Sequence, residues 1–217
     1  PSYPNTEGLN MSDHDDFAFE AAPGIPAPRP KGEEVLWQGR PATRALARDA
    51  FKIHWIGGYL ALIVLWKTGL GLAEGGVLMG LARGLPYLAL ALAGYGIVLA
   101  LAWAQARSTV YTITSARVLM RIGAALAVTY NIPFAQIGTA RLDQKADGTG
   151  TIALETLGET RLAFLALWPH LRPGRLKRTE PALRSIPDAT SVAKLLAEAA
   201  ETRLSMPVVT RSAPLPG

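Results

Sequence analysis

The chain contains no cysteine among its 217 residues, so it has no disulfide, no thiolate metal site and no cysteine nucleophile. Histidine is scarce as well, because only His14, His54 and His170 supply an imidazole. Charged residues make up 18% of the chain, below the ~25% of typical soluble domains. Hydrophobic residues make up 49%, and this balance indicates that long stretches of the chain lie outside water.

A strong excess of basic residues is also absent. The chain has 22 Lys and Arg against 17 Asp and Glu, a formal net charge of +5, which is low for a dedicated nucleic-acid binder. It has no GxxxxGK phosphate-binding loop, and few histidines are present to act as a general base beside a nucleophile. We therefore expect no enzymatic activity, no nucleic-acid partner, no metal site and no intrinsic cofactor.

Two apolar runs are long enough to cross a membrane. Residues 84–106 contain no charged residue, and at ~1.5 Å per helical residue they would cross a ~30 Å hydrocarbon layer. Residues 53–72 contain one charge, Lys67, which can extend its ammonium group to the membrane surface. The glycine-rich segment 73–83 joins the two runs. The sequence thus predicts two transmembrane helices in an antiparallel hairpin, within a segment 34–106 that includes a short lead-in.

Basic residues gather outside both ends of the predicted hairpin: Arg40, Arg44, Arg48 and Lys52 before it, and Arg107, Arg117 and Arg121 after it. Cytoplasmic flanks of membrane helices carry an excess of Lys and Arg, so we expect both termini on the cytoplasmic side of the membrane. Small residues let neighbouring helices approach closely in lipid. We predict such helix contacts at Gly57, Gly58, Gly94 and Gly96.

The hydrophobic pattern changes after residue 106. Val118, Met120 and Ile122 alternate with Leu119 and Arg121, a period of two that is typical of half-buried strands. Further on, Val192, Leu195, Leu196 and Ala199 recur at helical spacing after Asp188. These patterns predict an α+β domain over 107–206, with a curved antiparallel sheet closed by a C-terminal helix. Proline-rich residues 1–33 and residues 207–217 are expected to be extended tails.

Three short blocks carry a family resemblance. They are EEVLWQGRP at 33–41, YTITSARV at 111–118 and IPFAQI at 132–137. Together they resemble the bacterial membrane-anchored PH-domain families, in which similar blocks surround a pair of membrane helices. The resemblance implies a pleckstrin-homology-like (PH-like) fold for the domain.

Within that group, the chain resembles the photosynthetic complex assembly proteins of purple bacteria, which are encoded beside the reaction-centre H subunit. The resemblance covers residues 11–206 and includes DDFAFE at 15–20 and WPHLRPGR at 168–175. It implies an assembly factor of the chromatophore membrane, with reaction-centre subunits, light-harvesting complex 1 (LH1) polypeptides, lipids and a second copy of itself as expected partners. The alternative is a general membrane scaffold or lipid-sensing module, and genomic neighbourhood would distinguish the two.

Two candidate sites remain, each with a simpler interpretation beside it. His54, at the start of the first apolar run, could bind the magnesium of a bacteriochlorophyll transiently, but an interfacial histidine explains the position better. A loop bearing Trp168, His170, Arg172, Arg175, Lys177 and Arg178 is predicted to dock an acidic partner or an anionic headgroup. The simpler interpretation is a solvated loop between the last strand and the C-terminal helix. Separately, the apolar run 162–168 is too short to cross a membrane as a helix, so it does not add a third span.

Overall fold

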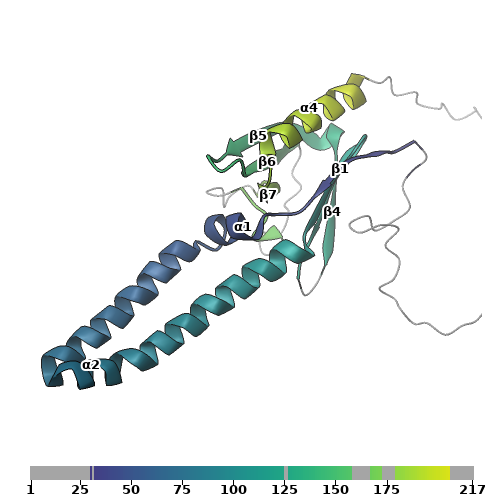
Figure 1. Cartoon of the computed structure of the whole chain (residues 1–217). Coiled ribbons are helices and arrows are strands. Elements are labelled where there is room, and N and C mark those ends of the chain that lie inside the picture. The colour runs from purple at the N-terminus through teal and green to yellow at the C-terminus, as the bar shows by residue number, and fades with distance from the viewer. Residues whose placement is uncertain (1–29, 31, 125–126, 158–166, 173–178, 206–217) are drawn as a thin grey trace, which may run out of the picture.

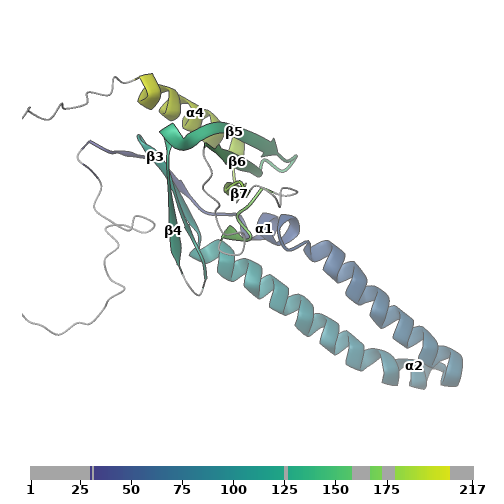
Figure 2. The same cartoon turned by 180° about the vertical axis from the view of Figure 1, so that it is seen from behind.

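A computed structural model of the chain describes residues 30, 32–124, 127–157, 167–172 and 179–205. It shows a long helical hairpin that extends from one side of a small α+β domain (Figure 1). The same arrangement is seen from behind in Figure 2, where the hairpin and the C-terminal helix point away from each other. The predicted tails lie largely outside the described residues, although Glu33 is tied to the domain by an ion pair with Arg117, 2.7 Å long.

The hairpin is formed by α2 (Ile53–Ser108), whose two helical arms meet at a sharp kink. Helical geometry breaks only at Gly75 and Gly76, where the chain reverses (Figure 1). Gly76 has φ +69° and ψ −160°, a conformation that a side chain would strain. The predicted loop at 73–83 is therefore wrong, because the two glycines alone make the turn. In the described part of the chain, α2 is the one helix long and apolar enough to cross a membrane.

Close backbone contacts hold the two arms of α2 together. A Cβ atom on Gly71 would lie 2.8 Å from Cα of Gly80, and one on Gly84 would overlap the Thr68 side chain. Nearer the domain, a Cβ on Gly57 would lie 3.1 Å from the ring of Tyr95. Small residues thus form the seam along which the two arms meet.

A four-stranded antiparallel sheet begins before the hairpin and continues after it. Its strands, in spatial order, are β1 (Val35–Gly39), β2 (Val110–Thr114), β3 (Arg117–Ile122) and β4 (Val128–Pro133). Trp37 of β1 pairs with Ile113 of β2, so the hairpin is inserted between two neighbouring strands. The predicted domain boundary at 107 is wrong on this point, because β1 belongs to the domain and not to the membrane lead-in.

A second, three-stranded sheet completes the domain. It contains β5 (Ile137–Gln144), β6 (Gly150–Thr156) and β7 (Ala182–Ile186), again antiparallel, and follows the short 3-10 helix η1 (Phe134–Gln136). Helix α4 (Ala189–Ser205) then packs against β5 and β6. The predicted order of antiparallel strands followed by an amphipathic helix is confirmed, although the strands form two sheets instead of one.

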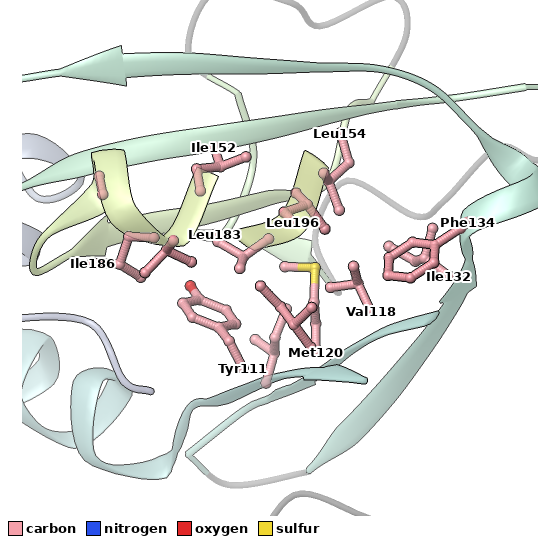
Figure 3. Close-up of a cluster of buried hydrophobic side chains, with 14 of the residues drawn as sticks. Tyr111, Val118, Met120, Ile132, Phe134, Ile152, Leu154, Leu183, Ile186 and Leu196 are labelled. Atoms are coloured by element: carbon pink, nitrogen blue, oxygen red, sulfur yellow. The ribbon is translucent and has the colours of Figure 1, made fainter. Parts of the chain in front are cut away.

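The hydrophobic core lies between the two sheets and α4 (Figure 3). Met120 and Ile113 from the first sheet, Leu154 and Leu183 from the second, and Leu196 from α4 are all at most 3% exposed. The alternation of the strands places these side chains on the inner faces. Burial of this apolar surface is the main stabilising contribution to the domain.

Candidate functional site

The hairpin and the domain meet at a junction built around helix α1 (Thr43–Asp49), which lies between β1 and α2 (Figure 1). Ala47 of α1 packs against Ile53 at the start of α2 and Ala102 near its end. Between the helices, Lys52 adopts a left-handed conformation with φ 53°, which turns the chain from α1 into α2. The junction therefore fixes both arms of the hairpin to one short helix.

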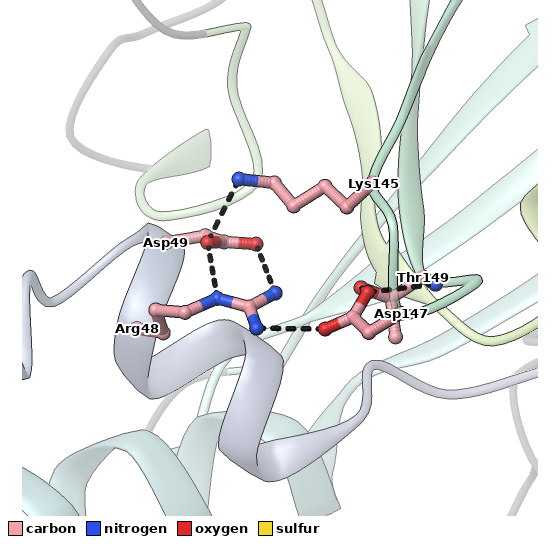
Figure 4. Close-up of polar contacts among 5 residues, drawn as sticks. All are labelled: Arg48, Asp49, Lys145, Asp147 and Thr149. Atoms are coloured by element: carbon pink, nitrogen blue, oxygen red, sulfur yellow. Dashed lines mark hydrogen bonds and ion pairs between the residues drawn. The ribbon is translucent and has the colours of Figure 1, made fainter.

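A cluster of four charged side chains ties α1 to the turn between β5 and β6 (Figure 4). We call Arg48, Asp49, Lys145 and Asp147 the latch. Arg48 Nε and Lys145 Nζ each donate to Asp49 Oδ1 at 3.0 Å, and Arg48 Nη1 donates to Asp147 Oδ2 at 2.7 Å. The latch thus joins residues that are almost a hundred positions apart in the sequence.

The carboxyl groups of the latch are ionised at neutral pH. Burial alone would raise the pKa of Asp49, but the hydrogen bonds from Arg48 and Lys145 outweigh it and lower that pKa below its ordinary value. The Thr149 hydroxyl, which donates to Asp147 at 2.6 Å, and Arg48 lower the pKa of Asp147 to about 2. Both carboxylates of the latch therefore stay charged throughout the physiological range.

A chain of buried hydrogen bonds joins β7 to the last turn of α2 through His170. Thr109 Oγ1 donates to the carbonyl of Gln105 at 2.7 Å, so it accepts the Nε2–H of His170 at 3.1 Å. The other ring nitrogen, Nδ1, accepts from the Tyr111 hydroxyl at 2.5 Å, and that hydroxyl accepts from the backbone N–H of Arg184 at 3.2 Å. This pattern assigns the proton of the neutral imidazole to Nε2.

His170 is fully buried and uncharged, unlike the docking residue predicted from the sequence. Burial, helped by the nearby positive charge of Arg184, lowers the pKa of His170 to about 3. The prediction that its imidazole contacts a partner or a headgroup is therefore wrong. The flanking prolines suggested an exposed loop, but the ring nitrogens are satisfied by groups distant in the sequence.

The other predicted docking residues do not form one exposed group in the structure. Trp168 is 43% exposed, and its ring meets that of Phe51 edge to face with centroids 5.2 Å apart. Arg172 donates to the buried carboxylate of Glu180 at 2.9 Å. Arg175, Lys177 and Arg178 lie outside the described residues.

The predicted membrane residues also occupy different environments. His54 is exposed in the first turn of α2, on a surface hollow shared with Trp55 and Gly58. A Cβ at Gly58, Gly94 or Gly96 would meet no atom within 4 Å, so these positions are open to a neighbouring helix. Gly57 instead packs inside the hairpin against Tyr95, and it borders an apolar groove of about 430 Å³ between the arms.

Residues 54–200 match the protein family described as bacterial PH domain. The chain belongs to this family. Since the match begins in the first turn of α2 and ends within α4, the bacterial PH-domain pattern includes the inserted hairpin as well as strands β2 to β7. No solved structure matches the chain.

A relative from Rhodobacter capsulatus is similar to this bacterial PH-domain protein over almost its whole length. It is described as an uncharacterized 23.7 kDa protein in the puhA 5′ region. The two sequences are 50% identical over 203 residues, which cover 92% of this chain and 94% of the relative. The similarity therefore includes the hairpin, the junction and both sheets.

Several residues of this bacterial PH domain were missed by sequence reasoning. The latch could not be found, because Asp49 and Lys145 are ordinary charged residues with no shared motif. The seam of the hairpin did leave a signal, since Gly80 and Gly84 lie four residues apart, a spacing typical of close helix packing. Gly80 lies within the predicted loop at 73–83, and Gly84 begins the predicted membrane run at 84–106.

Proposed function

We propose that α2 crosses a bacterial inner membrane twice, with both termini of the chain in the cytoplasm. Its first arm, residues 53–74, would be about 33 Å long at ~1.5 Å per residue, enough for the hydrocarbon layer. Leu65 and Leu92, which border the groove between the arms, are 68% and 65% exposed, which is favourable in lipid and costly in water. At the tip, Arg83 pairs with Glu74, so the turn carries little net charge.

We further propose that the protein is a non-enzymatic assembly factor for the photosynthetic reaction centre and LH1, of the type named PuhB. The observation that carries this proposal is the relative encoded in the puhA 5′ region of a purple bacterium. That location agrees with the resemblance to assembly proteins encoded beside the reaction-centre H subunit. The expected partners are reaction-centre subunits, LH1 polypeptides and the surrounding lipids.

The geometry supports a role in holding newly made membrane helices. Gly57 contacts Tyr95 and Thr68 contacts Gly84, so Gly58 and Gly94 lie at nearly the same depth along the two arms. Both positions are open, and a partner helix or a second copy of the chain can approach their backbones closely. The latch and the His170 hydrogen bonds hold the domain in a fixed orientation, so it can meet the cytoplasmic part of the same partner.

Deletion of the gene in a purple bacterium tests this function. We expect less reaction-centre and LH1 complex per cell, measured by quantitative absorption of isolated membranes, with the pigment bands of the remaining complexes unshifted. Normal complex levels would contradict the proposal and favour a general scaffold or lipid-sensing module. Shifted bands would point instead to a direct role in pigment binding.

A complementation experiment tests the pigment-ligand alternative for His54. We propose that His54 is an interfacial residue and that no pigment is held permanently by this chain. The His54→Leu gene should then restore complex levels as fully as the wild-type gene. Failure to restore them, at a normal level of the variant protein, would support transient bacteriochlorophyll binding through this imidazole.

A further inference from the structure

We infer that Trp168 inserts into the interfacial layer of an anionic membrane, so that the domain rests on the same bilayer that α2 crosses. The inference rests on the proposed membrane crossing and adds a third contact point to the two arms of the hairpin. It concerns a surface of the domain, and it does not depend on which complex the protein assembles.

The backbone around Trp168 is held rigidly. The His170 N–H donates to the Leu167 carbonyl at 2.6 Å, and Arg184 Nη1 donates to the Pro169 carbonyl at 3.0 Å. The Ala182 N–H of β7 donates to the His170 carbonyl at 3.0 Å. Within residues 167–171 only Trp168 is exposed, so a large apolar ring projects from an otherwise buried segment.

The contact with Phe51 places this ring at the boundary of the hydrocarbon layer. Phe51 lies two residues before Ile53, where the apolar arm of α2 begins. Trp55, in the first turn of that arm, is 81% exposed. Tryptophan favours the membrane interface because its ring is apolar while its indole N–H can hydrogen-bond to headgroups or water. Trp168 and Trp55 therefore lie at similar depths.

The charges near this boundary favour anionic headgroups. Arg44 and Lys52 are exposed and form no ion pair with any residue in the described ranges. Arg107, at the end of α2, lies over the Trp103 ring at 5.7 Å from its centroid. The nearest carboxylate of α1, Asp49, is already occupied by Arg48 and Lys145 in the latch. The exposed charge at the junction is therefore positive.

Depth-dependent fluorescence quenching tests the inference on the full-length protein. The chain has five tryptophans, so variants that keep one and replace the other four by Phe report single positions. Each variant is reconstituted into phosphatidylglycerol vesicles whose acyl chains are brominated near the headgroup. We expect the Trp168 emission to be quenched to at least half the extent seen for Trp55, and Trp37, which packs against the core from β1, to be unquenched.

The control positions separate the possible failures. If Trp55 is quenched but Trp168 is not, the inference is overturned while the membrane crossing stands, and Trp168 becomes available to a protein partner. If Trp55 itself is unquenched, the crossing and the inference both fail. Equal quenching of Trp168 in purely zwitterionic vesicles would overturn the requirement for anionic lipid.

A second measurement leaves four tryptophans in place. Because the chain has no cysteine, Trp168→Cys provides a single site for a spin label. In the same vesicles, we expect the label to collide more often with oxygen, which concentrates in lipid, than with a water-soluble nickel complex. The reverse preference would overturn the inference.

Discussion

The hairpin and the domain are both rich in leucine, but leucine side chains are mostly buried in the domain and mostly exposed on the hairpin. Leu183 in β7 is fully buried between the sheets, whereas Leu65 in α2 is 68% exposed. The domain is stabilised by removing apolar side chains from water, while the hairpin arms meet through glycines and leave their leucines outside. The same residue type therefore forms a water-excluding core in one region and an exposed apolar surface in the other.

Polar groups show the same contrast. The domain buries His170, Tyr111 and Arg184, and it links them through successive hydrogen bonds. In the hairpin, Thr68 satisfies its hydroxyl within its own helix by donating to the Val64 carbonyl at 2.8 Å. A membrane helix must satisfy its polar groups locally, whereas a folded domain can use partners distant in the sequence.

The largest expected effect comes from the same substitution made in both regions. Leu183→Ala should reduce the free energy of unfolding of the domain by about 2–5 kcal/mol, because it leaves a cavity in the core. Leu65→Ala should change it by less than about 0.5 kcal/mol, since an exposed side chain leaves no cavity. Denaturant unfolding in detergent micelles measures both, and equal losses would contradict the proposed difference between the two regions.

Glycine substitutions in the hairpin should have the next largest effect. Gly84→Leu should destabilise the paired arms by about 1–3 kcal/mol, because the new side chain would overlap Thr68. Gly94→Leu is the matched control, since no atom lies within 4 Å of its Cβ position. Distances between spin labels at Leu62→Cys and Leu90→Cys should lengthen or broaden only with Gly84→Leu.

Gly94→Leu, the control for pairing of the arms, should become the disruptive variant when binding of partner proteins is measured. Gly94→Leu should weaken co-purification with reaction-centre and LH1 subunits while leaving the spin-label distances unchanged, because it blocks an open surface. Unchanged co-purification would place the partner contact on another face of the hairpin.

Breaking the latch should have a smaller effect, at the point where the two regions meet. Asp49→Asn should reduce the free energy of unfolding by about 1–2 kcal/mol, because Arg48 and Lys145 lose a charged acceptor but remain partly accessible to water. Asp143→Asn, at an exposed position on β5, is the control and should change stability little. Equal effects of the two variants would show that the latch contributes nothing specific.

The last expected effect is a pH dependence that belongs to the domain alone. The folded-state pKa of His170 is about 3, below its ordinary value of 6.5, so the unfolded chain binds a proton more readily than the folded chain. Stability should therefore fall as pH drops below about 6.5, by up to about 1.4 kcal/mol per pH unit. Unfolding measured between pH 6 and pH 5, above the range in which Asp49 titrates, isolates this contribution.

A neutral replacement provides the control for the pH experiment. His170→Gln keeps a side chain that can donate and accept a hydrogen bond but cannot take up a proton. Its stability should be lower at pH 7 and flatter between pH 6 and pH 5 than that of the wild type. A slope equal to the wild-type slope would assign the pH dependence to another group.

Local patterns of the sequence were sufficient for several elements of this protein. The apolar run from residue 84 to 106 and the spacing of Val192, Leu196 and Ala199 predicted membrane-length and amphipathic helices, because periodicity and hydropathy depend only on nearby residues. The alternation around Met120 likewise predicted a strand. The seam of the hairpin was also predictable in principle, from the four-residue spacing of Gly80 and Gly84.

Only the tertiary structure determined which of those elements and side chains contact one another. β1 pairs with β2 across the inserted hairpin, Asp49 accepts a hydrogen bond from Lys145, and His170 lies between Thr109 and Tyr111. Each of these contacts joins residues separated by about sixty to a hundred positions, and no local pattern encodes such a pairing. Burial and charge partners are properties of the folded chain, so the roles of His170 and Trp168 could be separated only once the neighbours of each side chain were known.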